Sequence, residues 1–457
     1  PGEPSLPRVG ARLLLPPGEV VSEVRVTPGE KVLLGDGYTI EPGLRQYPLS
    51  HDGPREIAVA DYTPGESYPE TLVSEPVFGR FRGYGIANVS LSPVEYEAGS
   101  GRVYYYTSMD VEVVTESDPA GIRGVGKMIV HDRMTRHRLS RMVDNPTDAA
   151  LYETVERISD HGRVLDPALG YEYVIVTSNA WESYLADYVD WRTERGQKVG
   201  VFTREWIVAN YSGIDTQTQI RNFLIDAYAT WAMDYVLLVG DGEPSDGNGI
   251  PARGFYNDAY GEVDTNIASD LYYSCLDGTW DDDGDGYYGE VGEEDFYPEY
   301  GIGRVACSVS SDITNFITKT QRYSDTPIVS ECDEALMVGE LLWSSPLTYG
   351  GTYKDEILYG GTYNGYTTAG FPGTMNVGTL YDRDGSWSIN TLINQMETGM
   401  NIVNHLGHCN VDYFMKMTSS NIPSFDNDGT VHSLNFVYSQ GCYGGSFDNR
   451  TTGFTYG

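Results

Sequence analysis

The sequence predicts an α/β domain with a mostly parallel sheet flanked by helices, preceded by an all-β domain. Before about residue 120, short runs that alternate apolar and polar residues are separated by proline and glycine turns. After Tyr171, continuous apolar runs such as residues 173–176 alternate with segments of helical spacing. Such runs are typical of strands that are buried on both faces of a parallel sheet.

Residues 1–120 form the expected all-β domain. Strands are expected at residues 23–26, 103–106 and 110–114, where the sequence alternates with a period of two. The stretch contains no convincing amphipathic helix. It therefore predicts short strands joined by turns.

A basic linker is expected over residues 121–167. Arginine and lysine residues cluster at its start, including Arg123 and Lys127, and Asn145-Pro146 ends the run. A short helix is expected near residues 135–143. The cluster predicts either an ordinary solvated helix or a processing site between two domains, because exposed linkers are where proteases cut.

Residues 168–457 form the expected α/β domain. Buried strands are expected at residues 173–176, 199–202, 235–239, 335–339, 401–405 and 435–439. Helices are expected at residues 178–195, with Ser178 as the cap, and at residues 216–231, 313–323 and 388–397. This alternation favours a mostly parallel, doubly wound sheet.

The composition restricts the classes of function. The net charge of −36 disfavours nucleic acids and anionic membranes as partners, and it suits cations, basic peptides or solubility alone. No run approaches about 18 apolar residues, so no membrane span is expected.

The chain opens with Pro1-Gly2, which predicts a processed or trimmed N-terminus. Its five cysteines include no CxxC pair, which weakens a structural zinc site and leaves one or two disulfides open.

Two neighbouring strand ends carry residues of one chemistry. His408 follows one expected strand and Cys442 follows the next, each directly after a glycine. The gap of 34 residues (442 − 408) is enough for one crossover, and parallel strands end on the same edge of a sheet. An imidazole beside a thiol promotes thiolate attack and then protonates the leaving amine. A lone cysteine or histidine is usually structural, but the joint pattern predicts a nucleophile and a base.

At these residues the sequence resembles the gingipain-type family of cysteine peptidases, in the caspase-like clan. Gly407-His408 and Gly441-Cys442 match the strand ends that carry that family's catalytic pair. The stretch Gln440-Gly441-Cys442-Tyr443-Gly444 also looks like a caspase nucleophile motif. Further similar stretches are residues 2–7, 91–96, 270–273 and 297–304. The resemblance implies a caspase-like fold and a β-rich propeptide over residues 1–120.

The resemblance implies a secreted or cell-surface cysteine endopeptidase that is made as a zymogen. Cys442 would form a thioester with a peptide substrate, His408 would shuttle the proton, and backbone N–H groups at the turns of Gly441 and Cys409 would hold the oxyanion. Cys409 stands where the family has glycine. It either keeps the backbone donor or offers a second thiol beside the dyad.

The resemblance also implies an acid that orients the histidine, a substrate preference and a longer catalytic domain, and these have less direct counterparts in this sequence. Asp355 is the residue expected to orient His408, with Glu356 beside it. Arg or Lys before the scissile bond is expected if the pocket holds an acid, and the N-terminal domain is expected to inhibit until the linker is cut. Because such catalytic domains extend further, the present one is expected to be truncated after Gly457.

Two other functions stay open at this point. One is a catalytically inactive secreted binding or surface protein of the same fold, and the other is a thiol acyltransferase or transpeptidase. His405, which lies on the expected strand, is predicted to be a packed and hydrogen-bonded core residue. The alternative for it is a metal site shared with His408 and Cys409.

An acidic loop predicts a structural Ca²⁺ ion. Asp281, Asp283 and Asp285 alternate before Gly286, and Glu290 is expected to complete the shell, with Asp277, Glu293 and Glu294 as other choices. The twelfth position is Gly292 rather than glutamate, so the loop is not an EF-hand. The alternative is a solvated acidic loop. Residues 425–429 are a weaker second candidate.

Overall fold

The computed structural model describes residues 2–43, 65–118, 129–153, 164–243, 247–259, 262–345, 347–363 and 366–448. The chain forms two compact units, and neither is continuous in sequence. The first unit comprises residues 1–172, 210–235 and 253–302, and the second comprises residues 173–209, 236–252 and 303–457. These units cut across the linear division into residues 1–120, 121–167 and 168–457, which stays a prediction.

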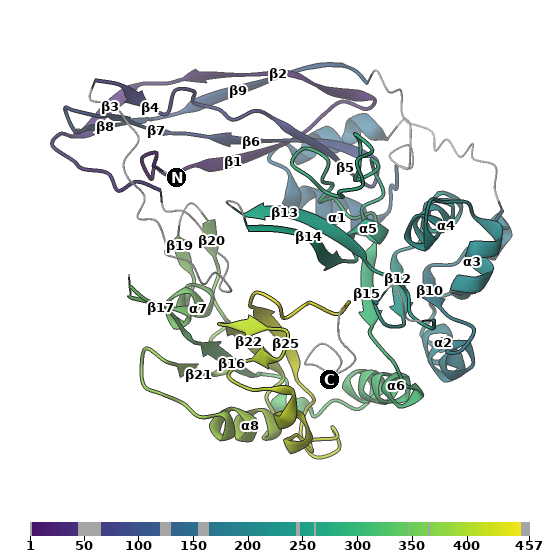
Figure 1. Cartoon of the computed structure of the whole chain (residues 1–457). Coiled ribbons are helices and arrows are strands. Elements are labelled where there is room, and N and C mark those ends of the chain that lie inside the picture. The colour runs from purple at the N-terminus through teal and green to yellow at the C-terminus, as the bar shows by residue number, and fades with distance from the viewer. Residues whose placement is uncertain are drawn as a thin grey trace. The chain divides into compact units, whose positions relative to one another are not determined.

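The N-terminal part of the first unit consists of strands, as predicted, and they pair antiparallel (Figure 1). They pair in the orders β1-β6-β5, β3-β8-β7-β4 and β2-β9. The strands are β1 Val9–Leu14, β2 Glu19–Pro28, β3 Lys31–Gly35, β4 Ser67–Tyr68, β5 Val77–Phe81, β6 Tyr84–Leu91, β7 Val94–Glu97, β8 Arg102–Tyr106 and β9 Met109–Ser117. Within described residues 2–43 and 65–118 there is no helix, in agreement with the sequence pattern.

The remaining elements of the first unit come from three stretches of the chain. They are α1 Arg133–Met142, η2 Pro146–Tyr152, η3 Pro167–Leu169, α4 Thr216–Trp231, β13 Arg253–Ala259, β14 Glu262–Ser269 and α5 Leu271–Ser274. Helix α1 confirms the helix predicted near residues 135–143. Arg123 and Lys127, on which the processing site was predicted, lie outside the described residues.

A buried arginine joins the N-terminal strands to later parts of the first unit. Arg82 is 1% exposed, and its Nε donates to the carbonyl oxygen of Glu299 at 2.6 Å. Its terminal nitrogens pair with the carboxylates of Asp132 at 2.9 Å and Asp234 at 2.7 Å. An apolar core lies beside it and contains Leu14, Phe81, Tyr84, Ile86, Ile129, Leu139, Val143 and Tyr152. The N-terminal strands and helix α1 therefore share one hydrophobic core.

One four-stranded sheet of the α/β part has the order β11-β10-β12-β15. Its strands are β10 Tyr173–Thr177, β11 Val199–Thr203, β12 Tyr235–Val239 and β15 Gly301–Val305. Neighbouring helices are η4 Glu182–Leu185, α2 Ala186–Glu194, α3 Arg204–Asn210 and α6 Ser310–Asp325. The helix predicted from Ser178 was placed too early, because the chain first makes a 3₁₀ turn and becomes α-helical only at Ala186.

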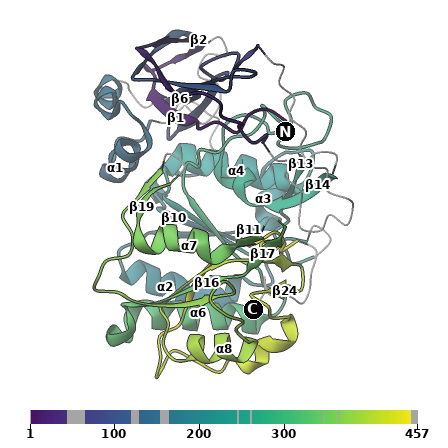
Figure 2. The same ribbon diagram turned by 90° about the vertical axis from the view of Figure 1, so that its left-hand side faces the viewer.

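A second four-stranded sheet, in the order β21-β16-β22-β25, is parallel throughout. Its strands are β16 Glu334–Gly339, β21 Asn376–Tyr381, β22 Ile402–Leu406 and β25 Phe436–Gln440. Helix α7 Gly350–Tyr359 and helix α8 Ile389–Glu397 cover opposite faces of it (Figure 2). The predicted fold class is confirmed, but the strands form two sheets instead of one.

Short elements precede or connect the strands of the second sheet. They are η5 Val329–Glu331, β17 Leu341–Ser344, β18 Leu347–Tyr349, β19 Gly361–Tyr363, β20 Tyr366–Thr368, β23 Cys409–Asn410, β24 Tyr413–Phe414 and η6 Ser419–Ser424. None of the five cysteines, all in the described part of the chain, forms a disulfide, so the bridges left open by the sequence are not made.

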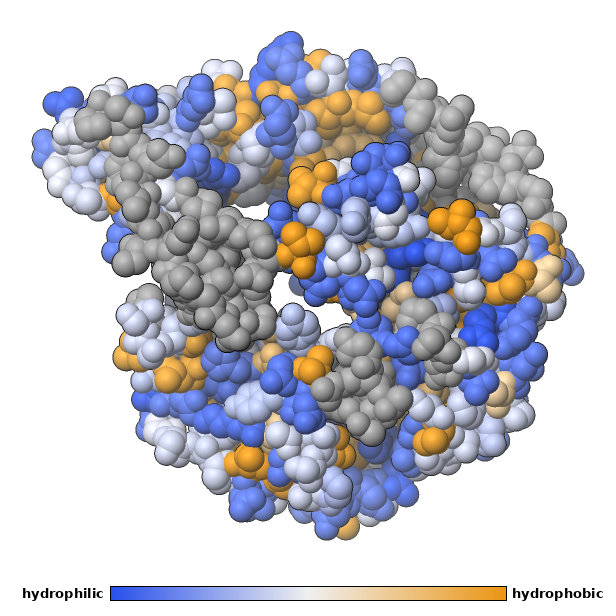
Figure 3. Space-filling model, in the orientation of Figure 1, coloured by the Kyte–Doolittle hydropathy of each residue, from blue (hydrophilic) through white to orange (hydrophobic). Residues whose placement is uncertain are grey.

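The surface carries both hydrophilic and hydrophobic residues (Figure 3). On the face in Figure 3, hydrophilic residues predominate among those coloured, and hydrophobic residues are scattered between them. Within the described part of the chain, no helix has both the length and the apolar character needed to cross a bilayer.

Candidate active site

The register of β22 and β25 places His408 and Cys442 at equivalent positions. The two strands are parallel neighbours whose last paired residues are Leu406 and Gln440. His408 and Cys442 each follow by two residues (408 − 406 and 442 − 440). The N–H of Gly407 donates to the carbonyl of Gln440 at 3.2 Å, which extends the pairing into the turns. Both residues therefore leave the same edge of the sheet at the same level.

The two side chains differ in exposure. Cys442 is exposed, so its thiol is accessible to a substrate. His408 is half-buried, and its Nε2 lies 2.9 Å from the carbonyl oxygen of Leu341. Because a carbonyl only accepts, this bond requires the proton on Nε2 and leaves Nδ1 as the basic nitrogen of the neutral ring. The carbonyl thus selects one tautomer.

His405, only three residues away, is a core residue. It is fully buried, with Nδ1 2.8 Å from Oγ of Ser439 and Nε2 3.0 Å from Oε1 of Glu340. Its ring also meets that of Phe414 edge-on. The prediction of a packed, hydrogen-bonded histidine is confirmed. Both ring nitrogens are occupied, so the alternative metal site with His408 and Cys409 lacks a free ligand atom on His405.

Glu340 is an acidic residue at the candidate active site that was not singled out from the sequence. It directly follows β16, is 2% exposed, and its N–H donates to the carbonyl of Leu406 at 3.0 Å. Its carboxylate therefore lies at the same strand edge but contacts His405. The sequence signal for Glu340 is its position directly after a buried strand. His408 and Cys442 were identified from the same kind of position, at the end of a parallel strand.

Asp355, expected to orient His408, is engaged elsewhere. Its carboxylate forms an ion pair with Arg383 at 2.8 Å, and it also contributes to raising the pKa of Tyr381, chiefly a result of burial. His408 instead has the Leu341 carbonyl as its hydrogen-bond partner. The contacts of Asp355 therefore do not support the expected role of orienting His408. Its carboxylate is paired with Arg383 instead.

Cys409 is buried beneath the turn that carries Cys442. It is 4% exposed, with Sγ 3.9 Å from Oγ of Ser439. A Cβ atom on Gly441 would collide with this sulfur, which explains the glycine before Cys442. Burial raises the pKa of Cys409 to about 11, so it stays a neutral thiol near pH 7. Cys409 is therefore a packing residue rather than a second nucleophile.

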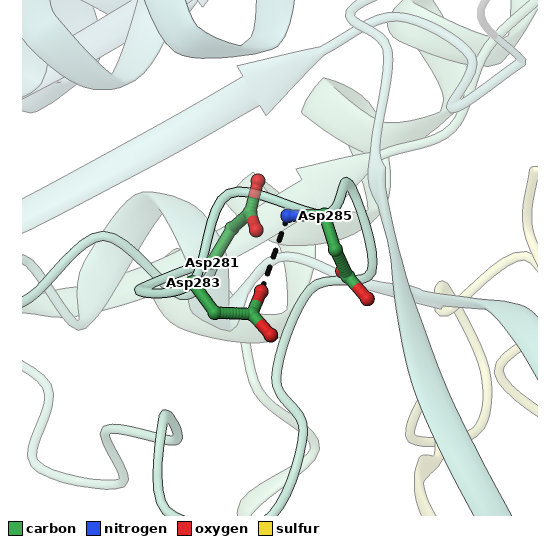
Figure 4. Close-up of side chains that lie close together, drawn as sticks. All are labelled: Asp281, Asp283 and Asp285. Carbon is green, nitrogen blue, oxygen red and sulfur yellow. Dashed lines mark hydrogen bonds between the residues drawn. The ribbon is translucent and has the colours of Figure 1, made fainter.

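The acidic loop brings three carboxylates together, as expected. Oxygens of Asp281, Asp283 and Asp285 lie within 4.8 Å of one another, and those of Asp283, Glu290 and Glu293 form an overlapping group. Figure 4 shows the first three projecting from one turn, where the Asp285 N–H donates to Asp283 at 3.1 Å. Burial and the carboxylates around it raise the pKa of Glu290. The donor set is all oxygen, which suits Ca²⁺.

Two buried carboxylates near this loop were not singled out from the sequence. Asp295 is 8% and Glu299 is 1% exposed, and one oxygen of each, Oδ2 and Oε1, has no hydrogen-bond partner. Burial and the charge of Asp277 raise the pKa of Asp295 to about 7, and the same causes raise the pKa of Glu299 well above its usual value. Orphaned buried carboxylate oxygens are costly unless a cation or proton compensates them.

Residues 166–456 match the profile of peptidase family C25. Gingipain R2 of Porphyromonas gingivalis is 25% identical over 238 residues, which cover 51% of this chain and 26% of that protein. Lys-gingipain W83 of Porphyromonas gingivalis is 23% identical over 410 residues, which cover 83% of this chain and 21% of that protein. The chain thus spans about a quarter or less of these relatives' length.

Solved structures similar to this chain include gingipains. The crystal structure of the Arg-specific cysteine proteinase gingipain R is 20% identical, with a TM-score of 0.45 over 64% of this chain and 59% of that one. The profile match covers more than half of the present sequence and includes both strand ends described above. The chain belongs to peptidase family C25.

Proposed function

We propose that this chain is the catalytic part of a secreted cysteine endopeptidase, with Cys442 as nucleophile and His408 as base. The observation that carries the proposal is the register of β22 and β25, which brings both residues to one edge of the sheet at one level. Membership of a peptidase family supports the reaction class. The exposed Cys442 thiol and the free Nδ1 of His408 supply the two groups that the reaction needs.

The proposed reaction follows the usual acyl-transfer order. His408 takes the proton of Cys442, and the thiolate attacks the peptide carbonyl to give a tetrahedral oxyanion. Backbone N–H groups at the turns of Gly441 and Cys409 stabilise that oxyanion. His408 then protonates the leaving amine, and water hydrolyses the thioester.

Replacing Cys442 by alanine tests the proposal. Cleavage of a fluorescent protein substrate is expected to fall to background, with an unchanged melting temperature. Cys332→Ala is the matched control, because Cys332 is also exposed but lies far from the strand ends in sequence. Activity retained by purified Cys442→Ala protein would sink the assignment. An inactive relative would fail to react with a thiol-directed peptide inhibitor, and a transpeptidase would ligate an added amine.

The N-terminal strands are proposed to act as an inhibitory propeptide. The Arg82 network and the shared core hold them against α1 and against the segment that carries Glu299. Cleavage within the linker, residues 121–167, is proposed to release this restraint. The negative charge of the chain favours basic peptides, so cleavage after Arg or Lys is the proposed preference. Profiling a peptide library before and after limited proteolysis tests both points.

A structural Ca²⁺ ion is proposed for the acidic segment. Asp281, Asp283, Asp285 and Glu290 offer a loop site, and the orphaned oxygens of Asp295 and Glu299 offer a buried one. A bound cation would compensate carboxylates that burial otherwise holds protonated. Calorimetric titration of EDTA-treated protein with Ca²⁺ tests the proposal, and absence of any heat or thermal shift would contradict it.

A further inference from the structure

A buried lysine bridges the two strands that carry His408 and Cys442. Lys354 lies on α7, and its side chain is fully buried. Its Nζ donates to Oδ1 of Asn404 on β22 at 2.6 Å and to Oε1 of Gln440 on β25 at 2.8 Å. A single ammonium group thus holds both strands.

The bridge lies immediately before the reactive turns. Gln440 is the last residue of β25, two residues before Cys442, and Asn404 precedes His408 by four. Asn404 pairs with Tyr438 in the sheet, so Gln440, two residues further along, projects from the same face. The lysine therefore fixes the end of one strand against the body of the other.

The opposite face of the strand pair has its own polar link. His405 and Ser439 are directly paired across the two strands, and Nδ1 lies 2.8 Å from Oγ. The strand pair is thus joined by side chains on both faces just before it ends. An apolar residue at position 354 would fill the space but supply neither hydrogen bond.

The chemistry of Lys354 points to a role beyond packing. No described carboxylate forms an ion pair with it, and burial lowers its pKa to about 8. Burying an amine without a carboxylate is unfavourable, and an apolar side chain of similar volume is usually the more stable choice. Its two directed bonds are what distinguish it from such a side chain.

We propose that Lys354 is a positioning residue that holds the ends of β22 and β25 in the relation that lets His408 meet Cys442. The inference rests on the proposed function, because it presupposes that pair. Lys354 contacts no reacting atom and acts through Gln440 and Asn404. Loss of the bridge frees the Gly441-Cys442 turn to shift, and displacements of about 1 Å in a catalytic pair cost rates of about 100-fold.

The test compares Lys354→Met with wild type and with Lys198→Met, an exposed lysine directly before β11 as the matched control. All carry Cys332→Ala, so that Cys442 is the exposed thiol that iodoacetamide modifies. For Lys354→Met, kcat is expected to fall about 10- to 100-fold with KM nearly unchanged. The pH profile of Cys442 alkylation is expected to move toward that of His408→Ala, which a purely structural role would not cause. Lys198→Met is expected to match wild type.

A second variant keeps the test decisive if Lys354→Met does not fold. Gln440→Met removes the acceptor on β25 at an exposed side chain and is expected to shift the alkylation profile in the same direction. The double variant is expected to be no worse than the more affected single variant, as for two residues that act through one bridge.

The outcomes separate the two proposals. If His408→Ala leaves the alkylation profile of Cys442 unchanged, the proposed function itself fails, and the role of Lys354 fails with it. If His408→Ala moves the profile but neither Lys354→Met nor Gln440→Met does, only the positioning role is overturned.

Discussion

The strand ends at His408 and Cys442 and the acidic segment around Asp281–Glu299 concentrate chemical groups in opposite ways. At the strand ends, the register of a parallel sheet sets the arrangement, and the Cys442 thiol stays exposed. In the acidic segment, a loop gathers exposed carboxylates while Asp295 and Glu299 are buried without full compensation. Under the proposals above, the first region supplies the reactive groups and the second would bind a stabilising cation.

This difference predicts separable effects of mutation. A change at the strand ends removes transition-state stabilisation and leaves the core intact. A change among the buried carboxylates alters the free energy of unfolding, because the cost of burial is part of the folded state. Variants that mix the two effects would show that the regions are not independent.

Among the variants that separate these two regions, the largest effect is expected for His408→Ala. Loss of the general base lowers kcat/KM by about 10²- to 10⁴-fold, with the melting temperature unchanged because His408 is only half-buried. Peptide-substrate kinetics and thermal unfolding measure the two quantities. His137→Ala, at an exposed histidine on α1, is the control and is expected to leave both unchanged. A variant with near wild-type kcat/KM would assign the base elsewhere.

Next in size is the pH dependence of stability in the acidic segment. Burial raises the pKa of Asp295 to about 7 and also raises that of Glu299. In metal-free protein, the stabilising protonated state is therefore complete below about pH 4, and that of Asp295 is lost as pH rises through about 7. The melting temperature in EDTA is therefore expected to fall between pH 5 and 8, by an amount equivalent to a few kcal/mol.

Calcium is expected to restore the melting temperature more at pH 8 than at pH 5. Glu299→Gln should weaken both the pH dependence and the response to Ca²⁺, whereas Glu30→Gln, at an exposed glutamate of the first unit, should change neither. A melting temperature in EDTA that rises with pH would contradict the sign argued here.

The strand ends were predictable because their signals are local. Helix α4 and strand β12 were predicted with their observed bounds, since each has a long, uninterrupted pattern. The edge rule for parallel strands then placed His408 and Cys442 together. These predictions needed no knowledge of which side chains are buried.

Other features depended on tertiary packing that the sequence does not display. Helix α7 was missed because it opens with Gly350-Gly351, which normally indicates a turn. A Cβ at Gly351 would overlap the ring of Tyr381, so the glycine permits a close approach of the helix to the sheet. Likewise, burial of Glu340 and Glu299 follows from the fold rather than from their neighbours in sequence.

A smaller effect is expected for Asp355→Asn. This variant tests whether Asp355 orients His408 or only forms an ion pair with Arg383. Asp355 pairs with Arg383 at a partly exposed site, and such pairs contribute about 0–1 kcal/mol. We expect a correspondingly small change in melting temperature and a kcat within about threefold of wild type. A loss of kcat comparable to that of His408→Ala would restore Asp355 as the orienting acid.

The smallest effect is expected for Asp283→Asn in metal-free protein. Asp283 is exposed, and its carboxylate accepts the Asp285 N–H at 3.1 Å, a bond that an asparagine oxygen also accepts. Without Ca²⁺, the change removes repulsion from nearby carboxylates, so stability should shift by no more than about 0.5 kcal/mol. With Ca²⁺, it removes a charged ligand and should weaken binding. Thermal unfolding with and without Ca²⁺ measures the difference, and an equal shift in both conditions would show that this loop holds no ion.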